Sequence, residues 1–338
     1  MTRAFVTGGG GFLGLALVEL LVAEGWQVTS GSRRRYDEVT RTGATSVTMD
    51  LGDADSVKQA VLDAAPDVVF HVAALAGVWG SRTDFERTNV TGTENVIDAC
   101  REAGVGRLVF TSSPSVCFDG ADHVDASNDL PYPDDYLAHY PETKARAERA
   151  VLAANDERLA TTAIRPHLIF GERDPHLFPR LIERARAGRL VIVGDAENEV
   201  SVTHVENAAA AHLDAARTLA VGSPHAGRAY FLGQKDPVKL WDWIAKILEG
   251  LDLPRPTRRV SVRTATFVGG FLETCWKLLP LSGEPPMTRF VAKQLGASHS
   301  YDLTPAMRDF GYVERVDLEA ATARTIAAFR PTTSHSSR

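Results

Sequence analysis

Cysteine is scarce in this chain, which limits the kinds of site it can hold. The 338 residues include three cysteines, Cys100, Cys117 and Cys275, and no two of them have the C-x-x-C spacing. Isolated cysteines in odd number argue against a disulfide framework and against a zinc site, and they indicate a reducing compartment. We therefore expect three buried free thiols, no metal site and a cytoplasmic location.

An excess of positive charge and long apolar runs are also missing. The formal net charge is -6 at pH 7, and the densest basic run is Arg33-Arg34-Arg35. Such a run is too short for a groove that binds nucleic acid, so we expect no nucleic-acid partner. No apolar run is long and uncharged enough to cross a bilayer. The first predicted strand starts by Ala4, which leaves no room for a secretory signal.

Glycine, by contrast, is concentrated near the start of the chain. Gly8, Gly11 and Gly14 follow the apolar run 4–6, and leucines at 13, 17, 20 and 21 then recur with helical spacing. Strand, glycine turn and helix form the arrangement that binds a dinucleotide, because the turn lets the backbone approach the pyrophosphate at the helix N-terminus. A glycine triplet alone also fits a turn without a ligand.

The ends of the next two predicted strands carry residues suited to the adenosine half of a dinucleotide. Ser32 ends the second strand and is followed by Arg33. NAD sites place a carboxylate there, whereas NADP sites omit the acid and supply a guanidinium for the 2′-phosphate. The pattern favours NADP(H), with NAD and a merely solvated basic turn as the alternatives. Asp50 ends the third strand, where it can accept a hydrogen bond from adenine, and Asp53 is expected to cap the following helix.

Two further buried strands, 67–71 and 108–113, end in small or hydroxyl-bearing residues. Ala73 and Ala74 would let the backbone lie close to a ribose or nicotinamide, and Ser113 is expected beside the nicotinamide, since open α/β sheets hold ligands at the carboxyl ends of their strands. We interpret His71 as structural. Asn89 is a poor helix former inside a predicted helix at 82–103, which indicates a kink or a buried polar role.

Tyr140 and Lys144 are the main catalytic candidates. Pro141 suits the first turn of a helix, and a run of alanines continues that helix, so the two side chains lie one turn apart on one face. An ammonium beneath a phenol is expected to lower the phenol pKa from about 10, so that the phenol can exchange a proton with a carbonyl oxygen during hydride transfer. In an arbitrary protein the same spacing more often marks a solvated Tyr and Lys.

The remaining segments point to a substrate region. Residues 119–135 are acidic and non-periodic, and we expect a surface loop that forms part of a substrate lid. Four possible cations follow the strand at 159–164: His167, Arg173, His176 and Arg180. One of them is a candidate to meet a substrate carboxylate, and the alternative for each is a helix-cap or surface residue. The apolar segment 264–280 predicts either a core or lid helix over the substrate pocket or a surface that docks on a membrane or a partner.

In combination these motifs resemble the extended short-chain dehydrogenases/reductases. The match consists of Thr7-Gly8-x-x-Gly11-x-x-Gly14, Asp50-Leu51, His71-x-Ala73-Ala74, Asn89-Val90-x-Gly92-Thr93, Ser113, Tyr140-x-x-x-Lys144 and Arg165-Pro166, in family order and spacing. Ala76–Gly80, 111–116 and 179–190 are similar to the 3β-hydroxysteroid dehydrogenase branch, and within it to 2-alkyl-3-oxoalkanoate reductases and sterol-4α-carboxylate 3-dehydrogenases. The resemblance covers about residues 3 to 330.

The resemblance implies an α/β fold, a Rossmann-type doubly wound parallel sheet with a smaller C-terminal α/β substrate lobe. We expect residues 1–170 and 201–237 in the NAD(P)-binding domain, 171–200 and 238–330 in the substrate lobe, and a disordered tail at 331–338. Tyr140 would be the general acid/base, Lys144 would tune it and hold the nicotinamide ribose, and Ser113 would orient the reacting oxygen. The expected cofactor-binding residues are Gly8, Gly11, Phe12, Leu13, Ser32, Arg33, Asp50, Leu51, Ala73, Ala74, Asn89, Tyr140, Lys144 and Pro166.

The implied activity is NADP(H)-dependent hydride transfer to or from a secondary alcohol or ketone of a small hydrophobic substrate, such as a 3-oxo or 3-hydroxy acid or a sterol-like compound. Two alternatives stay open: an NAD-dependent sugar-nucleotide epimerase or dehydratase, and a non-catalytic dinucleotide sensor. The family also leads us to expect a homodimer, and the apolar segment leaves room for peripheral membrane contact without a transmembrane span.

Overall fold

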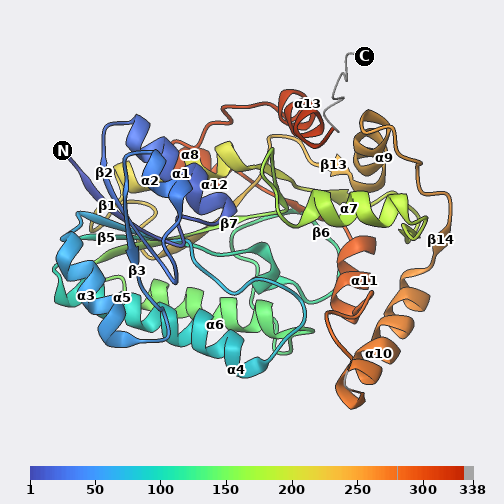
Figure 1. Cartoon of the computed structure of the whole chain (residues 1–338), viewed down its shortest axis with the longest axis horizontal. Coiled ribbons are helices and arrows are strands. Elements are labelled where there is room, and N and C mark those ends of the chain that lie inside the picture. Colours follow the sequence, from blue (N-terminus) through green and yellow to red (C-terminus); the bar gives the residue numbers. More distant parts are fainter. Residues whose placement is uncertain (280, 331–338) are drawn as a thin grey trace, which may run out of the picture.

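The computed structural model describes residues 1–279 and 281–330 and shows a three-layer α/β domain joined to a smaller lobe (Figure 1). The predicted tail at 331–338 lies outside the described residues. In Figure 1 the large sheet and its helices fill the left two thirds of the view, and the smaller lobe lies to the right. The predicted fold class is confirmed.

The large sheet has seven strands, all parallel, in the order β12-β7-β5-β4-β1-β2-β3. The strands are β1 (Arg3–Thr7), β2 (Gln27–Ser32), β3 (Thr45–Thr48), β4 (Val68–His71), β5 (Arg107–Thr111), β7 (Ala160–Pro166) and β12 (Arg228–Leu232). The strand order reverses between β1 and β4, and the crevice at the carboxyl ends of these strands is the ligand position in such sheets.

Helices cover both faces of this sheet, and their apolar residues pack against it. One face carries α1 (Phe12–Ala23), α2 (Asp37–Arg41), α8 (Val205–Thr218) and α12 (Thr304–Phe310) over a core that includes Leu17, Val18 and Tyr230. The other carries α3 (Ala54–Ala64), α4 (Arg82–Phe85), α5 (Gly92–Glu102) and α6 (His139–Ala153) over a core that includes Phe5 and Phe110.

The smaller lobe is built from short strands and five helices. Its four-stranded sheet runs β13 (Val238–Lys239), β10 (Glu199–Val200), β15 (His299–Tyr301) and β6 (His123–Ala126), and two strand pairs join β8 (Ile169–Phe170) to β11 (Thr203–His204) and β9 (Ile192–Val193) to β14 (Arg259–Val260). Its helices are α7 (Leu177–Arg186), α9 (Leu240–Gly250), α10 (Val262–Leu278), α11 (Arg289–Gly296) and α13 (Leu318–Phe329). Phe178 and Trp243 lie in their shared core.

Three local expectations need correction or refinement. The segment 119–135 is not loop throughout, because His123–Ala126 pairs with β15 as strand β6. The predicted helix at 82–103 is interrupted by a π-helical segment, η1 (Glu86–Thr91), at the predicted irregularity around Asn89. Cys100 and Cys117 are buried free thiols, whereas Cys275 is partly exposed.

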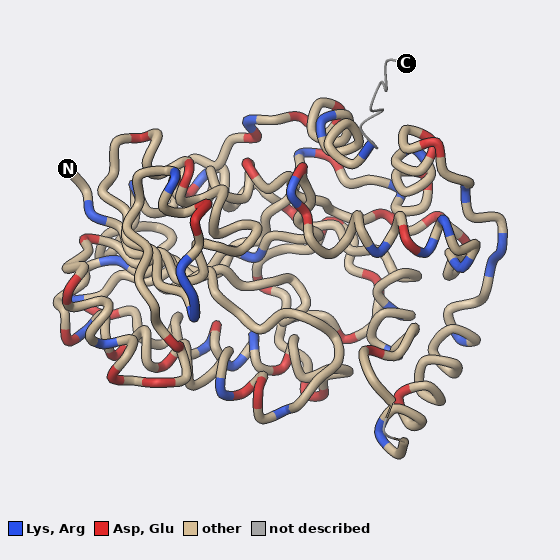
Figure 2. Tube along the Cα trace, viewed as in Figure 1, with Lys and Arg blue, Asp and Glu red and all other residues tan. Residues whose placement is uncertain are grey.

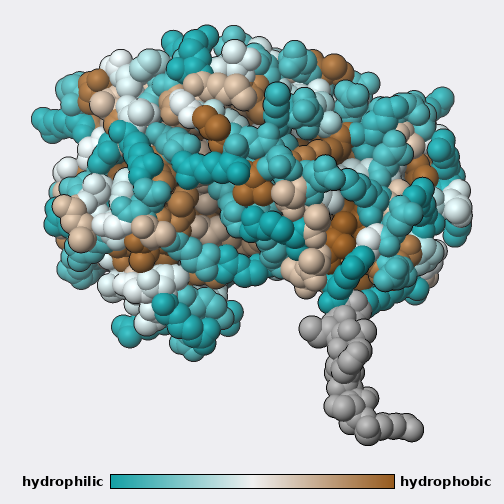
Figure 3. Space-filling model, turned by 90° about the horizontal axis from the view of Figure 1, so that it is seen from above, coloured by the Kyte–Doolittle hydropathy of each residue, from teal (hydrophilic) through white to brown (hydrophobic). Residues whose placement is uncertain are grey.

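Within the described part of the chain, no helix combines the length and apolar character needed to cross a bilayer. The charged residues are spread over most of the surface (Figure 2), and on the face shown in Figure 3 hydrophobic residues occupy small areas between hydrophilic ones.

Candidate active site

The glycine turn after β1 forms a concave backbone surface, the cradle, which has no room for a Cβ at Gly8 or Gly14. Gly8 has a φ of 73°, and a Cβ there would lie 2.9 Å from the Cα of Ala73. A Cβ on Gly14 would lie 2.1 Å from the Gly8 carbonyl oxygen, so the start of α1 packs directly on the turn. Gly11, the N-cap of α1, makes no side-chain cap, which leaves the helix N-terminus open to an anion. These features fit a dinucleotide pyrophosphate.

The adenosine end of the cradle is polar and basic. Ser32, the last residue of β2, and Arg33 line the same cavity as Asp50 and Leu51, which follow β3. The hydroxyl oxygen of Ser32 is buried without a hydrogen-bond partner among the described residues. Arg87, which no sequence motif singled out, donates to the Asp50 carboxylate, and this hydrogen bond lowers the pKa of Asp50. An orphaned hydroxyl in a cavity that is also lined by Arg33 and Arg87 fits a polar, anionic ligand group.

Helix α6 brings Tyr140 and Lys144 onto one face, and the Ser113 hydroxyl lies within hydrogen-bonding reach of the Tyr140 phenol. Ser113 caps the 3-10 segment η2 (Pro114–Cys117), accepting from the Ser115 backbone N–H at 3.3 Å and from the Ser115 hydroxyl at 3.0 Å. The three predicted catalytic side chains therefore converge at the carboxyl end of β5.

The pKa of Tyr140 differs from the expectation that the Lys144 ammonium lowers it. Burial raises the pKa of the Tyr140 phenol, and the hydrogen bond with Ser113 opposes the shift. Burial also lowers the pKa of Lys144 to about 7, against the effect of Glu148. The Lys144 ammonium nitrogen donates to the Thr111 carbonyl oxygen at 2.6 Å and lies 3.9 Å from the centre of the Phe110 ring. The raised pKa keeps the phenol protonated at neutral pH.

Asn89 supports the site from behind the cavity wall. It is 2 % exposed and does not line the cavity. Its side chain accepts from the Leu75 backbone N–H at 2.7 Å and donates to the Leu75 carbonyl oxygen at 3.0 Å and to the Thr143 hydroxyl at 3.1 Å. Asn89 thus ties the loop after β4 to the residue beside Lys144.

His71, like Asn89, supports the site from outside the cavity wall. Its ring nitrogens lie 2.8 Å from the Thr7 hydroxyl and 2.9 Å from the Thr93 hydroxyl, and the Thr7 hydroxyl also accepts from the backbone N–H of Val72 and Ala73. Burial, with a smaller effect of Lys144, lowers the pKa of His71 to about 3, so the ring is neutral. The hydrogen bonds of Thr7 hold the carboxyl ends of β1 and β4 together beside the glycine turn.

One cavity of about 600 Å³ holds nearly all the residues selected from the sequence. Its lining includes Gly8, Gly11, Phe12, Leu13, Ser32, Arg33, Asp50, Leu51, Ala73, Ala74, Ser113, Tyr140, Lys144 and Pro166. Apart from Ala76, the sequence did not single out the apolar part of the wall, formed by Leu75, Ala76, Leu168, Ile169 and Leu177. These residues come from the loop after β4, from the segment that leads into β8 and from the start of α7, and only the folded chain brings them to the same cavity as Tyr140.

A buried charge network lies behind the catalytic helix. Glu148, one turn beyond Lys144, is 0 % exposed and accepts from Arg165 Nε at 2.9 Å, from Arg165 Nη2 at 2.6 Å and from the Tyr132 hydroxyl at 2.6 Å. Burial favours the neutral acid, but Arg165 outweighs it and holds the pKa of Glu148 below its usual range. The pair joins α6 to β7, which ends at Pro166 in the cavity wall.

The four cations considered for a substrate carboxylate have different surroundings. His167 is buried outside the cavity wall, Arg173 pairs with Glu19 at 2.6 Å and Arg180 pairs with Glu284 at 3.0 Å. His176 lines the cavity. Asp174 accepts from three backbone N–H groups at the start of α7 and so holds this segment in place.

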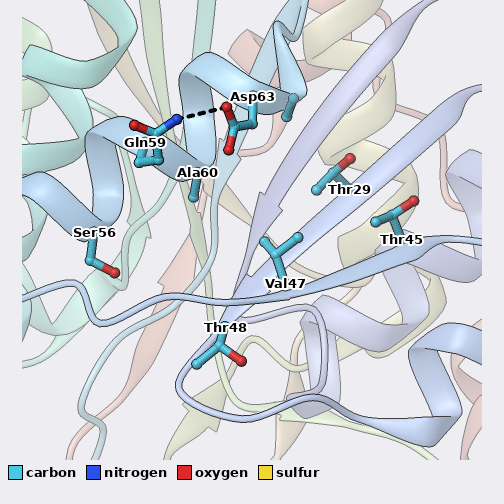
Figure 4. Close-up of a pocket in the computed structure, with 9 residues that line it drawn as sticks. Thr29, Thr45, Val47, Thr48, Ser56, Gln59, Ala60 and Asp63 are labelled. Atoms are coloured by element: carbon cyan, nitrogen blue, oxygen red, sulfur yellow. Dashed lines mark hydrogen bonds between the residues drawn. The ribbon is translucent and has the colours of Figure 1, made fainter.

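A second hollow lies between β3 and α3, away from the catalytic side chains (Figure 4). Threonines from β2 and β3 and polar residues of α3 line it, and Gln59 donates to Asp63 at 2.7 Å across one helical turn. None of the three catalytic candidates lines it. Among the described residues no group of three His, Cys, Asp or Glu side chains is placed to hold a metal ion.

The parallel sheet, its nucleotide crevice and the phenol, ammonium and hydroxyl at the strand ends together define a dinucleotide-dependent oxidoreductase. The comparison with known families agrees. The chain belongs to the 3-beta hydroxysteroid dehydrogenase/isomerase family, whose model matches residues 5–262. It is an NAD(P)-dependent dehydrogenase/reductase within the extended short-chain dehydrogenase/reductase fold.

Individual relatives cover nearly the whole chain. A 2-alkyl-3-oxoalkanoate reductase of Stenotrophomonas maltophilia (strain K279a) is 46% identical over 96% of this chain and 99% of its own length. The human sterol-4-alpha-carboxylate 3-dehydrogenase, decarboxylating, is 37% identical over 97% of this chain and 88% of its own length. Among solved structures, the Bordetella bronchiseptica enzyme WbmH in complex with NAD+ has a TM-score of 0.76 at 20% identity, covering 98% of this chain and 99% of its own, which shows a shared fold.

Proposed function

We propose that the protein uses NADP(H) to interconvert the 3-oxo and 3-hydroxy groups of a hydrophobic carboxylic acid, with reduction of the ketone as its main direction. One observation carries the proposal: Ser113, Tyr140 and Lys144 share a cavity with an apolar wall. The Stenotrophomonas relative, a 2-alkyl-3-oxoalkanoate reductase, acts on a substrate class that matches that combination.

Ser113, Tyr140 and Lys144 each have a separate role in the proposed reaction. A bound NAD(P)H supplies the hydride. Ser113 donates a hydrogen bond to the substrate oxygen and fixes it beside Tyr140. The Tyr140 phenol, whose raised pKa keeps it protonated, gives its proton to that oxygen as negative charge develops there. Lys144 holds positive charge beneath the site while it anchors to the Thr111 carbonyl.

The remaining wall fits the rest of such a substrate. Leu75, Leu168 and Leu177 offer apolar surface to an alkyl chain. His176 faces the same cavity without a salt bridge among the described residues, so it is our candidate for the carboxylate.

The choice of NADP(H) rests on the end of β2. Ser32 stands where an NAD site would place an acid, and Arg33 follows it into the cavity wall. A guanidinium beside a hydroxyl suits a 2′-phosphate, whereas the nearby acid Asp50 is engaged by Arg87.

The test is consumption of NADPH by the purified protein with 2-alkyl-3-oxo acids, their methyl esters, steroid ketones and simple ketones. We expect turnover with the 3-oxo acids and slower turnover with the esters; NADP+ with the 3-hydroxy acids should run the reverse reaction. Bound NAD that purifies with the protein, together with epimerisation of a sugar nucleotide and no net NADPH use, would instead support the epimerase alternative. Tight cofactor binding with no turnover of any kind would support a sensor.

A further inference from the structure

Arg87 contributes a guanidinium group to the wall of the cavity at the turn after β3. It belongs to η1, the π-helical segment that interrupts the helix predicted at 82–103. Its Nη2 donates to the Asp50 carboxylate, and both residues line the cavity. A π-helical turn inside a helix is rare and frequently lies at a functional site. Here the irregular turn brings a cation to the part of the cavity that suits the adenosine half of a dinucleotide.

The turn that carries Asp50 is shaped to receive this guanidinium. Gly52 has no side chain, and a Cβ there would lie 2.5 Å from Arg87 Nε and 2.6 Å from its Cζ. Asp50 Oδ1 accepts from the Gly52 N–H at 3.0 Å, while Oδ2 accepts from Arg87. The two donors on different oxygens fix the orientation of the carboxylate, and each oxygen keeps a lone pair for a further donor.

The backbone of the same turn is held by other contacts. Asn95 donates to the Leu51 carbonyl oxygen at 2.7 Å, and a Cβ on Gly92 would lie 2.8 Å from the Leu51 Cβ, so α5 packs directly on the turn. The side chains of Arg87 and Asp50 are both about half exposed, and such an ion pair contributes at most about 1 kcal/mol to stability. Loss of Arg87 should therefore free the Asp50 side chain without unfolding the turn.

We propose that Arg87 is a positioning residue for the adenine of the cofactor. It holds the Asp50 carboxylate so that Asp50 accepts a hydrogen bond from the exocyclic amino group of the base. An ionised, oriented carboxylate accepts from an amino group but repels a carbonyl oxygen, so the pair selects adenine over a base with a carbonyl at that position. The inference rests on NAD(P) binding and not on the choice of NADP(H) or on the proposed substrate, because both cofactors contain adenine.

Fluorescence titration tests the proposal with NADPH and NADH and with their deamino forms, in which hypoxanthine replaces adenine. We expect the wild type to bind each adenine cofactor about tenfold more tightly than its deamino form, the value of one charge-assisted hydrogen bond. In Arg87→Gln this ratio should fall to about two, because the Asp50 side chain regains its rotamer freedom. The matched control Arg82→Gln, at an arginine that pairs with Glu86 and Glu142 outside the cavity lining, should keep the wild-type ratio.

A double-mutant cycle with Asp50→Ala shows whether Arg87 acts through Asp50. Arg87→Gln should weaken NADPH binding several-fold in the wild-type background and change it little in the Asp50→Ala background, since a positioning residue has no effect without its partner. An equal further loss in the Asp50→Ala background would overturn the proposal, because Arg87 would then contact the cofactor itself.

The remaining outcomes separate this role from a structural one and from the choice of cofactor. Reduced nicotinamide mononucleotide, which lacks the adenosine half, should bind equally to the wild type and to both arginine variants. If Arg87→Gln weakens binding of the adenine and deamino forms equally, or if the wild type does not distinguish them, the inference fails even where NADPH turnover with 3-oxo acids is observed. Equal affinity for NADPH and NADH would contradict the NADP(H) assignment, while the ratios of adenine to deamino binding would still decide the role of Arg87.

Discussion

The phenol of Tyr140 is the group on which the proposed proton transfer depends. Tyr140→Phe removes one oxygen and leaves the packing of α6 and the Lys144 contact with Thr111 in place. We expect turnover to fall by about 10²–10⁴, because the proton donor is lost. NADPH affinity, measured by fluorescence titration, should change little. Unchanged turnover would exclude Tyr140 as the acid, and parallel loss of cofactor binding would mean that the variant damages the fold.

Arg33 is the residue on which the proposed choice of NADP(H) depends. It lines the cavity next to Ser32, whereas its neighbour Arg34 lies 4.8 Å from the centre of the Tyr36 ring and is not part of that lining. Arg33→Ala should weaken NADPH binding by about tenfold, the value of one charge-assisted hydrogen bond to phosphate, and leave NADH binding unchanged. Arg34→Ala is the matched control. Equal affinity of the wild type for both cofactors would contradict the NADP(H) assignment.

Helix α6 carries the two catalytic candidates, Tyr140 and Lys144, and the buried carboxylate of Glu148. Tyr140, Lys144 and Glu148 recur every four residues, and Glu148 is bound by Arg165 from β7. Among the described residues, the titratable groups near Lys144 are Tyr140 and Glu148 on the same helix and His71 at the end of β4. Because Glu148 opposes the fall of the Lys144 pKa toward about 7, it helps Lys144 stay protonated in neutral solution.

Glu148→Gln should therefore shift the pH profile of ketone reduction. Without the carboxylate the Lys144 pKa falls further. The pH at which activity is lost on the alkaline side of the profile should therefore move down by about one unit. Tyr132→Phe, which removes a hydrogen bond to Glu148 but no charge, should leave the profile in place, and Glu148→Asp should restore part of it. A loss of activity that is equal at every pH would show that Glu148 only holds α6 to β7.

Helix α6 also shows which residues of the site could be predicted from the sequence. Tyr140 and Lys144 could be predicted because their spacing is local, and the glycine turn because strand, turn and helix are adjacent in the chain. Glu148 was not selected, since its partners Tyr132 and Arg165 lie 16 and 17 residues away and meet it only in the folded core. Strand β6 was missed for a related reason: its partner β15 is more than 170 residues distant. The exposure of α10 was an open alternative, because periodicity cannot tell which apolar face is covered.

Across the whole molecule, buried histidines link stability to pH. His71, His212 and His299 are each at most 1 % exposed, and burial lowers the pKa of His71 to about 3 and of His212 and His299 to about 4. In the unfolded chain each would have a pKa near 6.5. These three rings are therefore neutral in the folded state at pH 5 and protonated in the unfolded state.

Unfolding at pH 5 thus takes up protons, so the free energy of unfolding must fall as the pH drops below about 6.5. Three such groups lower it by up to about 4 kcal/mol for each pH unit until the pH approaches their folded-state values. We expect urea unfolding to show this slope between pH 6.5 and 5 and little contribution from these groups above pH 7.5. His212→Gln, where the amide can still meet the Thr111 hydroxyl, should reduce the slope by up to about 1.4 kcal/mol per pH unit, the contribution of one such group. A flat profile over this range would mean that the rings are already protonated or accessible in the native protein.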